Sequence, residues 1–235
     1  MEPSCTVKLY KQLSAEKNGV PVVELTKFGH ACVRLEKDGR RLVIDPGGLT
    51  DPGALEGADA VLVTHEHFDH FSEEVLRRAA AAHPGLRIWT NSSVAKRLDG
   101  LGTQVTATGD GDAFGVAGFD IQVHGAWHAV IHPDIPRITN IGFLVDGTLF
   151  HPGDALTVPG IPVSTLLLPV HAPWSTVGDL IDYVREVAPR EAFAVHDGAL
   201  NDIGTTMVEG FLGERGPGVP ARYRRLVPGA SIRID

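Results

Sequence analysis

The sequence predicts an α/β fold, and three features carry this prediction. Short apolar segments of strand length alternate with a few stretches whose apolar residues recur at helical spacing. Glycine, proline and aspartate separate these segments, as expected for turns. No internal repeat, charge block or linker-like tract divides the chain, so we expect residues 1–235 to form a single domain, in which 1–20 could be a tail, an arm or a packed extension.

The first half of the chain is expected to alternate strands with helices. Apolar and β-branched residues predict strands over 22–28, 32–35, 42–44, 60–64, 87–90 and 104–108. A helix is expected to begin at Ser72, because Glu73 and Glu74 suit a first turn, and to end before Pro84. A shorter helix is expected over 93–98.

The second half continues this alternation. Strands are expected over 120–127, 165–170 and 192–195, and Asp146-Gly147 should join 141–145 to 148–150 in a tight hairpin. The apolar residues that follow Ser175 and Thr176 fall on one helical face and stop at Pro189. A last helix is expected over 205–212.

The stretch from Thr64 to His70 is the most informative part of the chain. It places three histidines and an aspartate within six residues, directly after the apolar segment 60–64. Imidazole and carboxylate together suit zinc, manganese or iron better than calcium or magnesium, which prefer oxygen ligands. A polar loop that is merely rich in histidine is the alternative. We predict a transition-metal site.

Further candidate ligands follow apolar strands at the point where each strand ends. Four residues share this position: His65, His128, Asp154 and His196. Strand ends can converge at one edge of a sheet, and rigid strands place ligands more accurately than mobile loops do. The sequence therefore predicts one centre assembled from separate segments.

The order of these residues resembles the metallo-beta-lactamase-fold superfamily. The resemblance rests on His65-x-His67-x-Asp69-His70, a later histidine, Gly153-Asp154 and a final histidine, and it covers roughly residues 22–235. The Phe-Gly-His-Ala of 28–31 and the Ile-Asp-Pro of 44–46 are similar to the branch that contains L-ascorbate 6-phosphate lactonase. The implied fold is a four-layer αββα sandwich with metals at one edge of two facing sheets.

The resemblance also implies a ligand set for two divalent transition-metal ions. It assigns His65, His67 and His128 to one ion, Asp69, His70 and His196 to the second, and Asp154 to a bridging position. Zinc is the first choice of metal, and manganese and iron are alternatives. A hydroxide shared by the ions would be the nucleophile. Asp69 is expected to orient the attacking water as a catalytic residue.

Other polar residues leave alternatives open. His124 and His132 compete with His128 for the first ion, and we choose His128 because it stands at the exit of its strand. The leaving group could take its proton from bulk water, from a metal-bound water or from His171, His132 or His30, and among the histidines we name His171 as the catalytic candidate.

His171 could also replace His196 as a ligand, since it too follows a strand. Asp45 is expected near His65 or His67. His151 is expected either to support Asp154 or to be structural only.

Composition excludes several classes of protein. No apolar run approaches the roughly 20 residues of a membrane-spanning helix, and the first residues lack the pattern of a secretion signal, so we expect a cytoplasmic protein. Cys5 and Cys32 are too few for a disulfide scaffold and are expected to be free thiols. A formal net charge of −8 argues against nucleic acid as a partner, and Arg222, Arg224 and Arg225 are expected on a solvated face. A homo-oligomer is compatible with the sequence.

The function that we predict is a binuclear metal-dependent hydrolase that uses the bridging hydroxide. Its substrate is expected to be a small, anionic ester, lactone or phosphodiester. His67 occupies the position at which the di-iron oxidoreductases of the superfamily carry glutamate, which disfavours a redox role. The alternatives are a non-catalytic metal-binding or regulatory protein of the same fold, and a small nuclease or phosphodiesterase.

Overall fold

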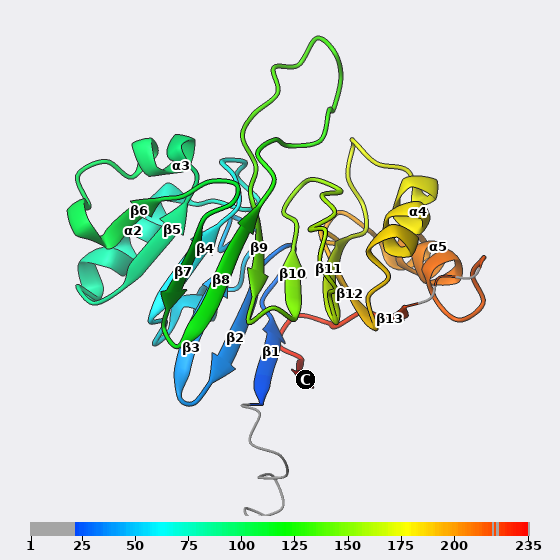
Figure 1. Ribbon diagram of the computed structural model, residues 1–235, viewed down its shortest axis with the longest axis horizontal. Coiled ribbons are helices and arrows are strands. Elements are labelled where there is room, and N and C mark those ends of the chain that lie inside the picture. Colours follow the sequence, from blue (N-terminus) through cyan, green and yellow to red (C-terminus); the bar gives the residue numbers. More distant parts are fainter. Residues whose placement is uncertain (1–21, 218, 220, 235) are drawn as a thin grey trace, which may run out of the picture.

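The computed structural model describes residues 22–217, 219 and 221–234. Two β-sheets face each other, and helices cover the outer face of each sheet (Figure 1). The predicted α/β class and four-layer αββα sandwich are therefore confirmed. The tail or arm expected over 1–20 lies outside the described residues, as does Cys5.

Each sheet has seven strands within the described residues. The first sheet contains, in spatial order, β14 (Ser231–Ile234), β1 (Val23–Lys27), β2 (Val33–Lys37), β3 (Arg40–Ile44), β4 (Ala60–Val63), β5 (Arg87–Thr90) and β6 (Val105–Ala107). The second contains β13 (Arg222–Arg224), β12 (Glu191–Val195), β11 (Thr165–Pro169), β10 (Leu149–His151), β9 (Gly142–Val145), β8 (Phe119–His124) and β7 (Ala113–Val116).

Pairing changes direction in the middle of both sheets. In the first sheet, β14 to β3 pair antiparallel and β3 to β6 pair parallel. In the second sheet, β7 to β10 pair antiparallel and β10 to β13 pair parallel. Parallel strands covered on both faces need apolar residues throughout, which explains why β4 and β11 are buried at every position.

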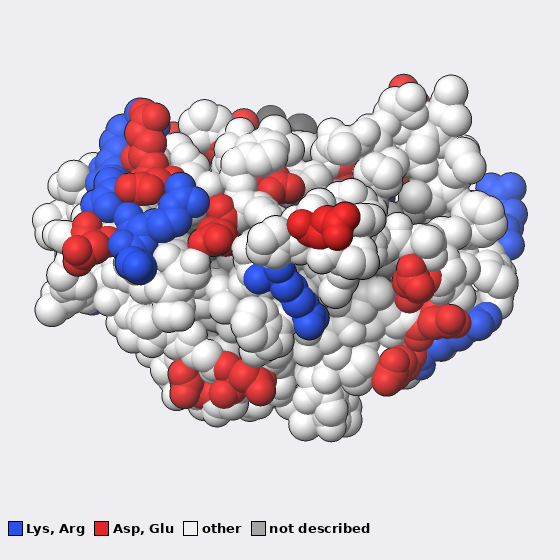
Figure 2. Space-filling model, turned by 90° about the horizontal axis from the view of Figure 1, so that it is seen from above, with Lys and Arg blue, Asp and Glu red and all other residues white. Residues whose placement is uncertain are grey.

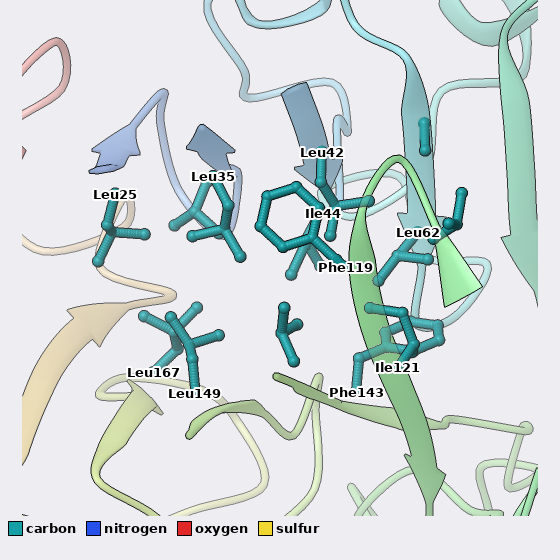
Figure 3. Packing of buried hydrophobic residues seen from close by; sticks show 14 of the residues in the cluster. Leu25, Leu35, Leu42, Ile44, Leu62, Phe119, Ile121, Phe143, Leu149 and Leu167 are labelled. Atoms are coloured by element: carbon teal, nitrogen blue, oxygen red, sulfur yellow. The ribbon is translucent and has the colours of Figure 1, made fainter. Parts of the chain in front are cut away.

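The main core lies between the two sheets. Leu25, Leu35 and Leu62 of the first sheet face Phe119, Phe143 and Leu167 of the second (Figure 3). In β8 the buried residues alternate with exposed ones, as in a strand with only one covered face. The apolar contact between the sheets thus fixes their relative position, and with it the spacing of the strand ends.

The helices form the outer layers. They are α2 (Glu73–Ala82), α3 (Ser92–Arg97), α4 (Val177–Val187) and α5 (Asp202–Leu212), with short 3-10 turns η1 (Pro52–Leu55) and η2 (Gly102–Gln104). Leu76 of α2 and Val94 of α3 pack on the first sheet, and Leu180 and Val184 of α4 pack on the second. No helix of the described residues is long and apolar enough to cross a membrane.

Helix α4 begins with a complete capping box. The Thr176 hydroxyl accepts a hydrogen bond from the Asp179 backbone N–H, and the Asp179 carboxylate accepts one from the Thr176 backbone N–H. The sequence left Ser175 and Thr176 as alternative starts, and the structure selects Thr176. Helix α5 begins earlier than predicted, because Asn201 caps it by accepting from the Gly204 N–H.

Three strands were not predicted from the sequence. β7, β13 and β14 are short and lie at sheet edges, and β14 pairs with β1 from the opposite end of the chain. The predicted strand over 120–127 ends at His124, because Trp127 is joined only to Thr139 by an isolated bridge.

The arginines expected on a solvated face differ in exposure: Arg222 is exposed, whereas Arg224 and Arg225 are partly exposed and paired with carboxylates. The Arg224 guanidinium lies 2.9 Å from the Glu191 carboxylate, and Arg225 donates a hydrogen bond to Asp197 at 2.7 Å. Arg222 is largely exposed, 3.9 Å from Glu191. Glu191 at the start of β12 and Asp197 just beyond its end supply the carboxylates that bind these arginines.

The contact between the sheets leads to a prediction about stability. Leu167 is fully buried in the main core, so Leu167→Ala should lower the free energy of unfolding by about 2–5 kcal/mol through lost apolar burial and a residual cavity. Ile203→Ala is the control, because this side chain is 72% exposed and should cost less than about 0.5 kcal/mol. Denaturant unfolding monitored by circular dichroism measures both, and equal losses would contradict the assignment of the core.

Candidate metal centre

The strand ends of the two sheets meet at one edge of the sandwich. Thr64 to His70 follow β4, Asp154 follows β10 and His196 follows β12, while His128 lies in the long loop between β8 and β9 that projects from the upper edge in Figure 1. The Asp154 carboxylate lies 3.0 Å from Nε2 of His70 and 3.1 Å from Nε2 of His196. The structure therefore brings the separate predicted segments together.

Two groups of side chains in the described residues could each hold a metal ion. The first group is His65, His67, His128 and Asp154, and the second is His30, Asp69, His70 and His196. Within each group, one candidate ligand atom per residue lies within 4.8 Å of all the others. All seven predicted ligands belong to these groups, and His30 is an additional member.

Asp154 lies between the two groups. One of its oxygens, Oδ2, is 3.3 Å from Nε2 of His128 and 3.9 Å from Nε2 of His65, and it also lies near His196 of the second group. The other oxygen, Oδ1, faces His70. Trp174 donates a hydrogen bond from Nε1 to Oδ2 at 3.2 Å and so helps to orient the carboxylate.

Asp45 holds two histidines in orientations that suit metal binding. The Nδ1 of His70 lies 2.7 Å from an Asp45 oxygen, which can only accept, so Nδ1 carries a proton and, once the ring is neutral, Nε2 is the nitrogen with the lone pair. The Thr64 hydroxyl donates to Asp45 and accepts from Nδ1 of His65 at 3.0 Å. Asp45 thus acts on His70 directly and on His65 through Thr64, whereas the sequence placed it near His65 or His67.

Backbone carbonyls hold two further histidines in the same way. Nδ1 of His128 donates to the Ala129 carbonyl, and Nδ1 of His196 donates to the His171 carbonyl, both at 2.6 Å. His67 instead turns Nδ1 toward the centre, 3.2 Å from Nε2 of His65. Such support behind a ligand fixes its tautomer and its orientation.

The atoms that face the centre are those that a cation would satisfy. Nε2 of His70, His128 and His196 and Oδ1 of Asp154 are buried and make no hydrogen bond of good geometry among the described residues. These atoms lie close to one another because their side chains all point toward the centre of the site. Buried polar atoms normally have partners, and imidazole nitrogens with carboxylates are the ligands that zinc, manganese and iron prefer. The residues present therefore fit divalent transition-metal ions.

Two residues of the centre have left-handed backbone conformations. Asp45 has φ 52° and His196 has φ 58°, a region that residues other than glycine rarely occupy. The His196 N–H donates to the His30 carbonyl at 2.8 Å. Beside it, the Asp197 carboxylate binds the buried Lys27 ammonium at 2.6 Å and Arg225 at 2.7 Å. This charged cluster secures the turn that presents His196.

Glycine is required at two positions that pack against residues 64–70, which we call the metal loop. A Cβ on Gly47 would overlap the backbone of Asp69 and His70, and Gly153 has φ 63° with Thr64 and Asn140 against it. Asn140 also accepts from the Asp154 N–H at 2.9 Å. No sequence signal distinguished Asn140, because its role depends on two loops meeting.

The charges at the centre shift the pKa values of its groups in opposite directions. Burial disfavours the charged form of His196, but the carboxylates of Asp154 and Asp69 outweigh burial and raise its pKa to about 9. Against the same opposition from burial, Asp154 and Asp45 raise the pKa of His70 well above its usual value. Burial and the charge on His70 lower the pKa of His65.

The carboxylates stay ionised despite their burial. His70, His128 and His196 hold the pKa of Asp154 well below its usual value. Contacts with His196 and His30 do the same for the pKa of Asp69. Both carboxylates are therefore available to a cation at neutral pH.

The remaining candidates lie outside the two groups. The His171 side chain is exposed, and its contribution to the centre is its carbonyl. His124 packs its ring against Phe150, and His132 is exposed and pairs with Asp134 at 3.6 Å. The choice of His128 over these two residues agrees with the geometry.

His151 supports the centre without touching Asp154 directly. Its Nδ1 accepts from the Gly153 N–H at 3.1 Å, and its Nε2 lies 3.2 Å from the Ala31 carbonyl. It therefore fixes the turn that precedes Asp154.

A flap borders the first group. We define the flap as residues 129–138; with His67 and His128, most of its residues line a hollow of about 20 Å³, which is large enough for about one water. Val130 and Ile135 of the flap are 56% and 49% exposed, and the neighbouring Trp127 is 52% exposed. Arg137 donates to the His128 carbonyl at 2.5 Å and lies over the Trp127 ring.

Comparison with known proteins gives a consistent family assignment. A family model described as a beta-lactamase superfamily domain matches residues 24–196. Protein Rv0786c of Mycobacterium tuberculosis is 37% identical over 180 residues, which cover 74% of this chain and 84% of that protein. A UPF0173 metal-dependent hydrolase of Methanosphaerula palustris is 33% identical over 141 residues, which cover 56% of this chain and 60% of the relative.

A solved structure agrees at the level of the fold. Igni18, a metallo hydrolase from the archaeon Ignicoccus hospitalis, matches with a TM-score of 0.66 and 22% identity over 91% of this chain and 99% of that chain. The resemblance to the lactonase branch stays a prediction. The family match, the shared fold and the metal-ligand motif lead to one conclusion: the chain belongs to the metallo-beta-lactamase-fold superfamily.

Proposed function

We propose that this metal-dependent hydrolase works with two divalent ions, zinc first among the candidates, and cleaves a small ester, lactone or phosphodiester. The observation that carries the proposal is the position of Asp154, whose carboxylate lies within 4 Å of histidines of both groups: Oδ2 is near His65 and His128 of the first group and near His196 of the second, and Oδ1 is near His70 of the second. A single ion would leave several of these ligand atoms buried without a partner.

The proposed ligands of the first ion are His65, His67 and His128, and those of the second are Asp69, His70 and His196, with Asp154 shared. When bound, two such ions make water acidic enough to ionise near neutral pH and stabilise negative charge on the substrate. The Nδ1 contacts described above keep Nε2 of the His65, His70, His128 and His196 rings directed inward.

Asp69 and His171 are the proposed catalytic residues. The Asp69 carboxylate lies 3.4 Å from Nε2 of His196 and is partly exposed, so it can accept a hydrogen bond from a water that approaches the second group. We keep His171 as the candidate proton donor. Its carbonyl accepts a hydrogen bond from His196, and its imidazole is exposed just beyond the end of β11, at the same edge of the sheet.

The flap indicates the chemistry of the substrate group that is not cleaved. Its exposed Val130 and Ile135, with Trp127, offer apolar surface next to His67 and His128. Figure 2 shows that uncharged residues predominate across the middle of this face, while many of its basic residues gather at the left margin among acidic ones. We propose a substrate with an apolar group that the flap covers, and an anionic group that Arg137 can contact.

Metal content and turnover test the two-ion proposal together. The protein reconstituted with zinc should contain about two ions per chain by elemental analysis, and Asp154→Asn should lower the occupancy of both sites. Turnover in a screen of esters, lactones and phosphodiesters should fall by at least about 100-fold in Asp69→Ala. Two bound ions without any turnover would favour the non-catalytic metal-binding alternative, and less than one ion per chain would refute the proposal.

Proton release on metal binding follows from the charges at the centre. Because their pKa values are raised, His70 and His196 carry a proton on Nε2 at neutral pH, and an ion must displace it. Zinc binding near neutral pH should therefore release about one to two protons, and fewer as the pH rises past about 9. Calorimetry in buffers of different ionisation enthalpy measures the release. His83→Ala should not change it, since His83 is exposed at the end of α2; heat independent of the buffer would contradict the expectation.

The role of the flap predicts a preference for apolar substrates. Among p-nitrophenyl esters, kcat/KM should rise with acyl chain length, and Val130→Ala, at a flap residue that lines the hollow, should reduce that rise by about 1–2 kcal/mol of binding free energy, mainly through KM. Val158→Ala is the matched control, because Val158 is also exposed but lies outside the residues that line the hollow. A flat chain-length series in the unmodified protein would exclude the proposed contact.

A further inference from the structure

His30 belongs to the second group by position, but its hydrogen bonds differ from those of the ligands. It is 4% exposed and follows Gly29, whose φ of 151° and close approach to Leu49 exclude a side chain there. Nδ1 of His30 accepts a hydrogen bond from the Gly198 N–H at 2.9 Å. Its carbonyl accepts from the His196 N–H at 2.8 Å.

The contact with Gly198 determines where the proton of His30 resides. A backbone N–H can only donate, so Nδ1 of His30 carries the lone pair. In a neutral imidazole the proton is then on Nε2, the nitrogen that faces the centre. His65, His70, His128 and His196 have the opposite arrangement, with an acceptor at Nδ1. A protonated nitrogen has no lone pair to offer a metal.

The Asp69 carboxylate is an acceptor within reach of the proton on Nε2. Nε2 is buried, makes no hydrogen bond of good geometry among the described residues, and lies 3.3 Å from Oδ2 of Asp69. For Nε2 to bind an ion, the proton would have to move to Nδ1, and the buried Gly198 N–H would lose its acceptor.

We propose that His30 is a positioning residue of the second site and not a metal ligand: its Nε2–H donates to Oδ2 of Asp69 and fixes that carboxylate. The proposal rests on the proposed function only in assigning Asp69 to the second ion. In this arrangement, His30 holds Oδ2 of Asp69, and the other Asp69 oxygen is available to the ion and to water. His30 thereby also links Asp69 to the 196–198 segment.

The tautomer of His30 can be read directly by NMR. Long-range proton–nitrogen correlations of isotopically labelled protein should show His30 with its proton on Nε2, both without metal and with the NMR-active cadmium isotope bound. His70 and His196 should show scalar coupling to cadmium, and His30 should show none. Coupling from cadmium to His30, or a proton on its Nδ1, would overturn the proposal.

The same experiment separates this proposal from the proposed function. If cadmium couples to none of the histidines, the two-ion assignment fails, while the tautomer of His30 is still read from the metal-free protein. A proton on Nε2 of His30 would then support the hydrogen-bond arrangement alone.

Variants test the consequence for metal affinity. His30→Ala should retain about two zinc ions per chain at saturation but bind the second about 10-fold more weakly, and His30→Gln, whose amide can both accept and donate, should recover part of that loss. His83→Ala is the control at an exposed histidine. Loss of one ion at saturation would identify His30 as a ligand, and unchanged affinity in His30→Ala would show that it does not position Asp69. Circular dichroism confirms that each variant is folded.

Discussion

The carboxylate of Asp45 is the interaction on which the metal centre depends. It is fully buried and accepts hydrogen bonds from the Thr64 N–H, the Thr64 hydroxyl and Nδ1 of His70. An unpaired buried carboxylate would cost several kcal/mol, so the folded chain must supply these donors. Because the same carboxylate orients His70 directly and His65 through Thr64, it connects the second group of candidate ligands to the first.

The fold places Asp45 where it can do this. β3 and β4 pair in parallel, so both chains leave the sheet at the same edge, and the Asp45 N–H donates to the Leu62 carbonyl of β4. The left-handed backbone at Asp45 directs its side chain toward the metal loop. Gly47 approaches the backbone of Asp69 and His70 closely, so the segment after β3 packs directly against this loop. The position of the histidines is therefore a property of the sheet as much as of the motif.

The sequence was sufficient for the parts of this structure that depend on local pattern. The spacing from His65 to His70 indicated metal ligands, and the apolar runs of β4 and β12 indicated buried strands that end beside them. It was insufficient where distant segments meet. β14 pairs with β1, although the two strands lie near opposite ends of the chain. Arg225 can reach Asp197 only because β13, which Arg225 follows, pairs with β12, which precedes Asp197. Each of these contacts lacks a periodic signal.

His30 and Asp45 show the same limit within the site. Both were singled out from short motifs, but the role of each depends on a partner that only tertiary structure supplies, Gly198 for His30 and His70 for Asp45. Donor or acceptor identity in a histidine is decided by the group on its other nitrogen. The residue type alone therefore does not distinguish a ligand from a neighbour of a ligand.

The origin of the ligands in both sheets has a consequence for the order of events in folding. His65, His67, Asp69 and His70 come from the first sheet, whereas His128, Asp154 and His196 come from the second. Each of the two candidate groups takes side chains from both sheets, so an ion bound as proposed would be held tightly only after the two sheets have packed together. Such an ion would link the two sheets, and its slow release would delay their separation.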